Sequence, residues 1–92
     1  MSAISDHAVP RFPHGVRFRE DKARSAFILV APERIFQADE VSIEILKRID
    51  GKTHFADILA QLAEVFTAEL SVIRPDVESF LLDLQGKQRV EL

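Results

Sequence analysis

The sequence contains no cysteine, no tryptophan and no tyrosine, and only three of its 92 residues are glycine. The absence of cysteine excludes disulfides, thiolate nucleophiles, zinc ribbons and cysteine-ligated iron–sulfur clusters. Three glycines could hardly build a phosphate cradle, and neither the P-loop nor the GxGxxG motif occurs. The seven phenylalanines therefore provide all of the aromatic packing.

Long hydrophobic runs are also missing. No apolar stretch approaches the about 20 residues of a membrane helix, and the opening stretch MSAISDHAVPRFPHG lacks the apolar block of a signal peptide. We therefore expect a soluble, cytoplasmic protein with no membrane partner. The net charge of −3, from 15 acidic and 12 basic residues, also speaks against a partner held mainly through its phosphate groups.

The chain length fits one small domain. Residues 1–14 hold two prolines, two histidines and no periodicity, which is typical of a flexible N-terminal arm. Residues 15–92 are then a single domain, and the hydrophobic fraction of 47% is ordinary for a folded chain.

Three short strands are predicted at the start of this domain. Residues 15–20 alternate between apolar and charged, residues 26–31 are apolar on both faces, and residues 34–37 alternate again. Residues 21–25 form a connection of hairpin length. Because the third strand is caught between Pro32 and a helix, we expect it at a sheet edge, with unpaired backbone groups facing outward.

Three helices are predicted to follow. Asp39 can cap the first and Gly51 can end it, while Thr53 can cap the second, which extends to Phe66. The third begins near Ser71 or near Pro75 and ends at Gly86. Residues 89–92 could add a short strand. The apolar positions of the first and third helices recur at helical spacing: Val41, Ile45, Leu46 and Ile49, and then Val77, Phe80, Leu81 and Leu84.

This order predicts an α+β fold that resembles a winged helix-turn-helix, with a three-stranded antiparallel sheet followed by three helices. A winged-helix DNA-binding regulator is therefore the alternative function. Its third helix would enter the major groove with basic or amide side chains. Residues 75–86 instead offer three carboxylates, one glutamine and no Lys or Arg, so we expect no nucleic-acid partner.

Catalytic groups are not evident either. His7, His14 and His54 are the only histidines, and none stands in a metal-ligand spacing such as HExxH. No GxSxG motif occurs. We predict no catalytic residue, no metal site and no cofactor, and therefore not an enzyme.

What remains is binding at the sheet edge. Phe80, Leu81 and Leu82 are three consecutive large apolar residues on the third helix, and a helix that packs on one side buries only part of such a ring. One flank could line a groove, although the same stripe would also serve as core. A groove beside an open strand is the arrangement of β-augmentation sites. The residues alone thus indicate a small peptide- or protein-binding module.

Four stretches together resemble the PqqD family of pyrroloquinoline quinone (PQQ) biosynthesis proteins over nearly the whole chain. They are PRFPHGVRFRED at 10–21, LVAPER at 29–34, ILKRIDGKTHFADIL at 45–59 and DVESFLLDL at 76–84. Members of this family are peptide chaperones, and their fold is a recognition element for ribosomally made peptides. The resemblance implies a non-catalytic protein that binds the precursor peptide PqqA by strand addition and presents it to the radical SAM enzyme PqqE.

Carried onto this chain, the resemblance implies a peptide strand beside residues 34–37 and a wall on the third helix. The open edge, or an exchange of segments, would also allow a homodimer. The peptide-binding residues that we predict are Arg34, Ile35, Phe36, Gln37, Val77, Phe80, Leu81 and Leu84.

Overall fold

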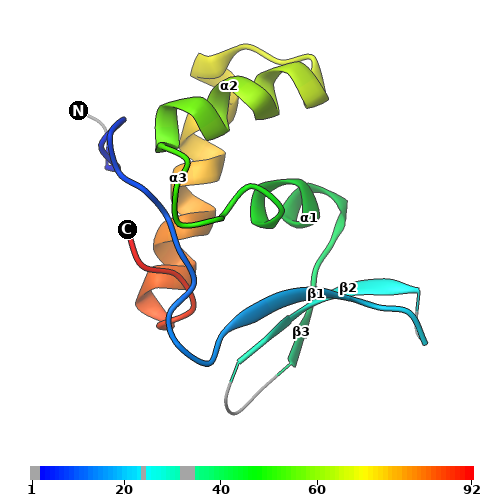
Figure 1. Cartoon of the computed structure of the whole chain (residues 1–92). Coiled ribbons are helices and arrows are strands. Elements are labelled where there is room, and N and C mark those ends of the chain that lie inside the picture. Colours follow the sequence, from blue (N-terminus) through cyan, green and yellow to red (C-terminus); the bar gives the residue numbers. More distant parts are fainter. Residues whose placement is uncertain (1–2, 24, 32–34) are drawn as a thin grey trace.

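The computed structural model describes residues 3–23, 25–31 and 35–92, and of Phe36 and Gln37 it describes the backbone only. The elements in chain order are β1 (Arg17–Asp21), β2 (Ala26–Val30), β3 (Ile35–Gln37), α1 (Glu40–Leu46), α2 (Phe55–Phe66) and α3 (Leu70–Gly86). The predicted α+β class is confirmed. The sheet lies below the helices, and α1 stands between the sheet and α2 (Figure 1).

The sheet is antiparallel in the order β1-β2-β3. Leu29 of β2 pairs with Phe18 of β1, so both side chains lie on one face. This face packs toward α3, because Leu29 belongs to a small apolar cluster with Val16 and Ala31 against which Leu84 of α3 lies. The sheet is thereby fixed to the C-terminal half of α3.

The helices supply most of the core. Asp39 caps α1 as predicted, since its carboxylate accepts a hydrogen bond from the Ser42 backbone N–H at 2.8 Å. The amphipathic helix α2 buries Phe55, Ile58, Leu59 and Leu62. The main core cluster consists of Ile4, Ile45, Leu46, Ile49, Phe55, Ile58, Leu59, Leu62, Val77, Leu81 and Val90.

The connection between α1 and α2 differs from the prediction. Helix α1 ends at Leu46, before Gly51, and His54 rather than Thr53 is the N-cap of α2. The Thr53 hydroxyl instead donates to the Asp50 carboxylate at 2.9 Å, and this carboxylate also accepts the backbone N–H groups of Lys52 and Thr53, both at 2.8 Å. The prediction of a Thr53 cap was wrong because Asp50 organises a turn that engages this hydroxyl first.

Helix α3 begins at Leu70, close to the earlier of the two predicted starts, and Pro75 lies inside it. The start near Pro75 was therefore wrong. That prediction rested on the preference of proline for a first turn, which reflects its missing N–H. Pro75 is exposed, so water can reach the backbone carbonyl that loses its helical partner there.

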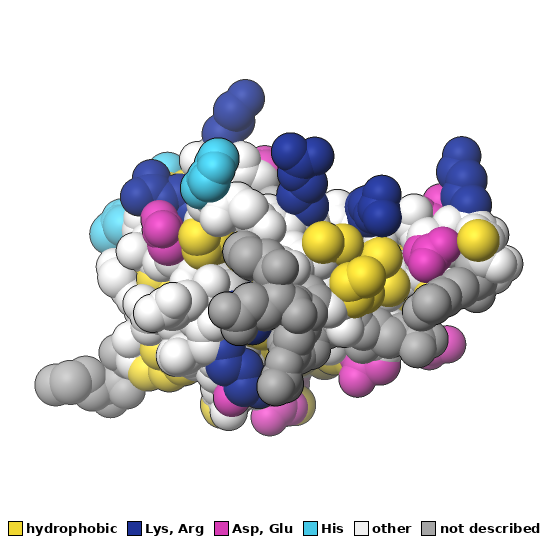
Figure 2. Space-filling model, turned by 90° about the horizontal axis from the view of Figure 1, so that it is seen from below, with side chains coloured by type: hydrophobic (Ala, Val, Ile, Leu, Met, Phe, Trp, Pro, Cys, Tyr) yellow, Lys and Arg dark blue, Asp and Glu magenta, His cyan; other side chains and the backbone are white. Residues whose placement is uncertain are grey.

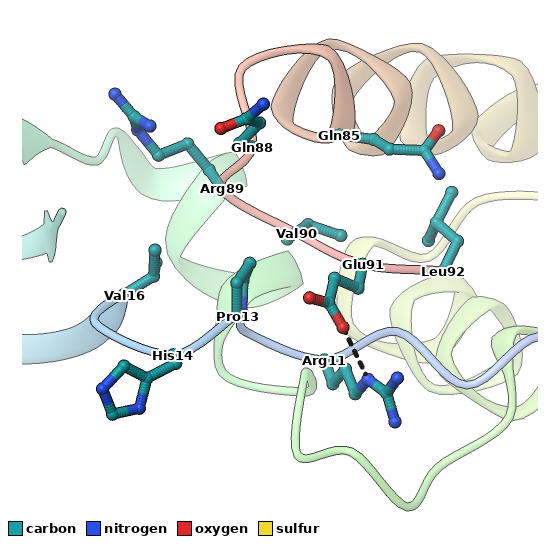
Figure 3. Close-up of a pocket in the computed structure, with 10 residues that line it drawn as sticks. All are labelled: Arg11, Pro13, His14, Val16, Gln85, Gln88, Arg89, Val90, Glu91 and Leu92. Carbon is teal, nitrogen blue, oxygen red and sulfur yellow. Dashed lines mark hydrogen bonds and ion pairs between the residues drawn. The ribbon is translucent and has the colours of Figure 1, made fainter. Parts of the chain in front are cut away.

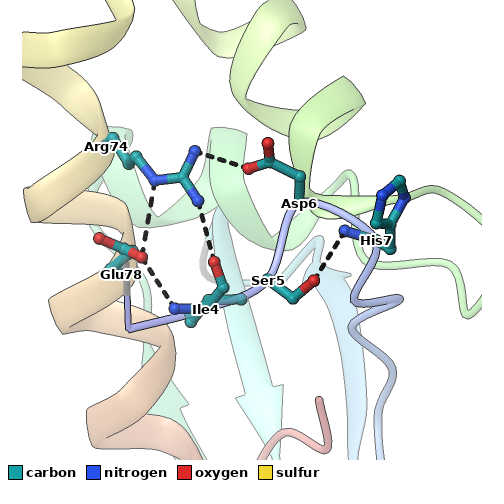
Figure 4. Close-up of polar contacts among 6 residues, drawn as sticks. All are labelled: Ile4, Ser5, Asp6, His7, Arg74 and Glu78. Carbon is teal, nitrogen blue, oxygen red and sulfur yellow. Dashed lines mark hydrogen bonds and ion pairs between the residues drawn. The ribbon is translucent and has the colours of Figure 1, made fainter. Parts of the chain in front are cut away.

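Residues 3–14 also differ from the expected flexible arm, because they lie against the helices (Figure 1). Ile4 is 2% exposed in the main core, and its burial is worth about 1.5–3 kcal/mol. Its backbone N–H donates to a Glu78 carboxylate oxygen at 2.9 Å, and its C=O accepts from Arg74 at 2.9 Å. Arg74 also pairs with Asp6 at 2.7 Å (Figure 4). The Arg74 guanidinium stands over the Phe55 ring, 5.3 Å from its centroid.

The segment before β1 pairs with the C-terminal segment of the chain. Arg11 and Glu91 exchange two backbone hydrogen bonds, of 2.9 and 2.8 Å, and their side chains form an ion pair at 2.9 Å. The strand predicted for residues 89–92 is thus present as an isolated bridge. The sequence did not predict that residues 3–14 pack against the helices. The residues around Ile4 show no periodicity, and a single buried isoleucine creates no pattern.

Candidate functional site

The outer edge of β3 is the first element of the site. Within the described part of the chain, β3 pairs with β2 and with no other strand. The Ala38 N–H donates to the Phe27 carbonyl at 3.0 Å, which extends the β2–β3 ladder by one residue. Because bonded and non-bonded pairs alternate along an antiparallel ladder, Phe36 is bonded to β2, whereas the N–H and C=O groups of Ile35 and Gln37 face the open edge.

An apolar groove between α1 and α3 is the second element. It consists of two adjoining cavities of about 150 and 370 Å³, which share Ser42 and Phe80 in their walls. The smaller cavity reaches the sheet at Leu29 and Ala38, directly beside the end of β3. We call the two cavities together the α1–α3 groove; its walls include Val41, Ser42, Ile45 and Leu46 of α1 and Ile73, Val77, Phe80 and Leu84 of α3.

The structure separates the predicted residues of α3 into two groups. Phe80 and Leu84 are half-buried and line the groove. Val77 and Leu81 are 5% and 0% exposed and belong to the main core, although Val77 also borders the larger cavity. Leu81 has no surface left for a ligand, and Val77 has almost none.

Of the four residues predicted on the third strand, the structure describes Ile35 in full and only the backbones of Phe36 and Gln37. Ile35 lies at the edge with 60% of its surface exposed. The backbones of Phe36 and Gln37 form the rest of β3, and their side chains, like all of Arg34, lie outside the described residues.

Sequence reasoning missed the contribution of α1 and α2. Val41 was assigned to the core stripe of the first helix, yet it is 55% exposed at the groove. Phe66 at the end of α2 is 39% exposed and lines the same cavity. The position of each residue at the very start or end of its helix was the available signal, because helix ends project beyond the layer that covers their middle.

Charged groups flank the groove with opposite sign at its two ends. Asp39 and Asp76 line the larger cavity, and Lys87 and Arg89 line the smaller one. The pKa of Asp39 is lowered, first by the hydrogen bond from the Ser42 backbone N–H and then by that from the Ser42 side chain. Asp39 therefore carries its full negative charge at neutral pH.

The sheet face turned away from the helices has a different character. Figure 2 shows it from below, with an exposed apolar patch and basic side chains projecting along one border. Arg17 and Arg19 of β1 are exposed and lie on this face together with Ile35, by their register with β2. A strand added at β3 would thus point alternate side chains toward this face and toward the groove.

A third cavity, of about 630 Å³, lies between the segment before β1 and the C-terminal segment (Figure 3). Arg11, His14, Gln85, Gln88 and Glu91 give it a polar lining of mixed charge.

Within residues 3–23, 25–31 and 35–92, no group of three or more His, Asp or Glu side chains could hold a metal ion. None of the helices described above is long and apolar enough to cross a membrane.

Known proteins resemble this chain in sequence. The PqqA binding protein of Xanthomonas campestris pv. campestris strain B100 is 36% identical over 92 residues, which is the full length of both chains. The bifunctional coenzyme PQQ synthesis protein C/D of Methylorubrum extorquens is 36% identical over 90 residues. That alignment covers 98% of this chain but only 24% of the bifunctional protein.

Two solved structures share the fold. The NMR structure of the PqqD truncation of Methylobacterium extorquens PqqCD has a TM-score of 0.78 and 35% identity, and covers 99% of this chain and 97% of that one. It is described as a functional, stand-alone recognition element for ribosomally synthesised and post-translationally modified peptides. The crystal structure of PqqD from Xanthomonas campestris has a TM-score of 0.58 and 34% identity, and covers 98% and 100%.

Two of these relatives, the PqqA binding protein and the recognition element, are named for binding and recognition, which are non-catalytic roles, so the prediction that the chain is not an enzyme is confirmed. The family described as coenzyme PQQ synthesis protein D matches residues 26–90. The match spans well over half of the chain and agrees with the full-length relatives. The resemblance seen in the sequence is thus confirmed, and the chain belongs to the PqqD family.

Proposed function

We propose that this protein is a peptide chaperone of PQQ biosynthesis, which binds the precursor peptide PqqA as an added strand on β3. The observation that carries the proposal is the open edge of β3 beside the α1–α3 groove. An edge strand supplies main-chain hydrogen bonds, and an adjacent groove accepts alternate side chains. Full-length relatives named as PqqA binding proteins support PqqA as the ligand.

In this proposal the backbone groups of Ile35 and Gln37 pair with the peptide. The side chains on the Leu29 face of the added strand would then enter the groove against Phe80 and Leu84. Arg34 and the side chains of Phe36 and Gln37 remain part of the proposed site. Val77 and Leu81 support the groove from behind as core residues.

We further propose that the bound peptide is presented to PqqE, as the family resemblance implies. Strand addition leaves one side of the peptide backbone and alternate side chains accessible, and a modifying enzyme needs such access.

A second copy of the chain could pair with the same edge as a homodimer, and peptide would then compete with dimerisation.

The winged helix-turn-helix interpretation also remains a proposal. Three strands before three helices fit a wing that precedes the helical unit. For the DNA-binding alternative, α3 would have to approach phosphates with Asp76 and Asp83, both exposed, on its surface. This charge opposes the contact, so peptide binding is the function that the geometry favours.

The proposal is tested by replacing Ile35 with proline and, as a matched control, with alanine. Ile35→Pro removes an N–H that faces the open edge and no bond to β2, whereas Ile35→Ala keeps the N–H and removes only side-chain contacts. Calorimetric titration with PqqA should show a clear loss of affinity for Ile35→Pro and a smaller one for Ile35→Ala. An NMR titration of the labelled protein should place the largest amide shifts in β3 and along the groove.

A folded Ile35→Pro protein that binds PqqA as tightly as the wild type would refute strand addition at β3. Amide shifts confined to the β1 edge or to the cavity between the segment before β1 and the C-terminal segment would move the site elsewhere.

A further inference from the structure

We propose that the larger cavity of the α1–α3 groove is a second anchor site for the bound peptide, and this rests on the proposed function of peptide binding. The site takes a bulky apolar side chain, with a basic residue next to it, from the segment that continues beyond the strand paired with β3. The observations behind it are the position of the cavity away from the sheet, its apolar wall and the two carboxylates that line it.

The larger cavity lies away from the sheet. Its described lining residues all belong to the three helices or to the cap of α1, and none belongs to a strand. Along α3 it extends from Phe80 to Ile73, a rise of about 10 Å toward the start of the helix, whereas the sheet packs near Leu84. Phe66 adds α2 to the wall, and α2 lies on the far side of α1 from the sheet (Figure 1). We therefore assign the smaller cavity to side chains of the strand paired with β3, and the larger cavity to residues outside that strand.

The chain that follows β3 passes the two cavities in turn. Ala38, directly after β3, lines the smaller cavity, and Asp39 and Val41 line the larger one. The two cavities adjoin at Phe80, which lines both. A peptide that continues past the C-terminal end of β3 along the start of α1 therefore reaches the larger cavity. The length of this cavity along α3 corresponds to about three extended residues, so the anchor belongs within a few residues of the paired strand.

The wall of the larger cavity is apolar and partly open to water. Val41 of α1 and Phe66 of α2 are exposed, and the buried Ile45 and Leu62 also line the cavity. An apolar cavity of about 150 Å³ is enough to bind benzene. The volume of about 370 Å³ therefore has room for a leucine or phenylalanine side chain. Exposed large apolar side chains that converge on one cavity from two helices are typical of a binding site.

The charge at the larger cavity defines the neighbour of the apolar anchor. Asp39 and Asp76 are exposed and line the cavity, and none of the described residues that line it is basic. The two hydrogen bonds from Ser42 that lower the pKa of Asp39 keep its carboxylate charged at neutral pH. A lysine or arginine next to the anchor would pair with these carboxylates, whereas an acidic residue there would be repelled.

The first test is an NMR titration of the labelled full chain with PqqA. The methyl resonances of Val41 and Ile73 should shift, and they should show NOE contacts to an apolar side chain of the peptide. The backbone amides of β3 should shift in the same titration, because the strand pairs there while the anchor fills the cavity.

The second test removes apolar wall from the larger cavity. Phe66→Ser and Val41→Ser change exposed positions, and each should weaken PqqA binding by about five- to thirtyfold in calorimetric titration. The matched control is Val65→Ser, because Val65 is the neighbour of Phe66 on α2, is also exposed and lines neither cavity. This control should bind like the wild type, and urea denaturation checks that all three variants fold.

The third test concerns the basic neighbour of the anchor. Asp76→Asn should weaken PqqA binding by about two- to fivefold, the expectation for an exposed ion pair. The loss should shrink in about 0.5 M salt, where such a pair is screened. The control Asp57→Asn removes the same charge from α2, lines neither cavity and should leave the affinity unchanged.

The outcomes separate this inference from the proposed function. Shifted β3 amides beside unshifted Val41 and Ile73 methyl groups, with wild-type affinity of both cavity variants, overturn the second anchor and leave the proposed function in place. Methyl shifts that follow protein concentration without peptide assign the cavity to a second copy of the chain and overturn it as well. Wild-type affinity of Asp76→Asn alone refutes the basic neighbour. Failure of PqqA to bind overturns the proposed function and this inference with it.

Discussion

The division of the α3 stripe into groove and core predicts different outcomes for two neighbouring residues. Leu81 is 0% exposed in the main core, and Phe80 is half-buried in the wall of both groove cavities. Leu81→Ala should cost about 2–5 kcal/mol of folding free energy through the cavity that it leaves. This is a large part of the about 5–14 kcal/mol that holds a domain of this size together.

Phe80→Ala should affect binding instead. We expect the Phe80 ring to be an aromatic anchor for the peptide in the groove. Its removal should weaken PqqA binding by about 1–3 kcal/mol, or about five- to 150-fold. Its stability cost should stay below the about 3–5 kcal/mol of a fully buried phenylalanine. Leu82→Ala is the control, because Leu82 is 36% exposed and lines neither cavity of the groove.

Urea denaturation and calorimetric titration on the same three variants separate the two effects. The reasoning fails if Phe80→Ala binds PqqA with wild-type affinity while it loses as much stability as Leu81→Ala. In that case α3 contributes core alone, and the peptide site lies elsewhere.

Three further predictions concern the rest of the molecule. Because α3 exposes carboxylates, a gel shift at moderate salt should show no complex that survives competitor DNA, and a sequence-specific nanomolar complex would restore the DNA-binding alternative. The pKa of Asp50 is lowered, first by the backbone N–H of Lys52, so its stabilising effect is present above the ordinary value of about 3.9 and is lost as pH falls through the lowered value. The gap in urea midpoint between wild type and Asp50→Ala should therefore narrow from pH about 7 to pH about 3, and a constant gap would contradict this. Ile4→Ala should cost about 2 kcal/mol or more in urea denaturation, whereas an unchanged midpoint would favour a flexible arm.

Local rules in the sequence determined much of this protein. Asp39 lies where a cap can accept the Ser42 N–H, and that contact spans only three residues. Alternation over residues 15–20 and the apolar run after residue 25 predicted the first two strands, because period two is a property of each strand alone. The edge position of β3 followed from Pro32 and from the helix that begins directly after it.

The tertiary structure decided which apolar residues are core. Helical spacing placed Val77, Phe80, Leu81 and Leu84 on one stripe, but it could not show that α2 covers part of this stripe while α1 and the sheet leave the rest open. Ile4 joined the core without any pattern around it, through contacts with residues about seventy positions away.

The charged ends of the groove were decided in the same way. Asp39 and Asp76 stand 37 positions apart in the chain and line one cavity, and Lys87 lines the other cavity together with Leu29 of β2. A local sequence pattern depends only on neighbours within a few residues. It therefore indicates which side chains one helix or strand can bury or pair. The partners that meet across the groove are set by how the segments pack, so only the folded chain could bring these charges to its two ends.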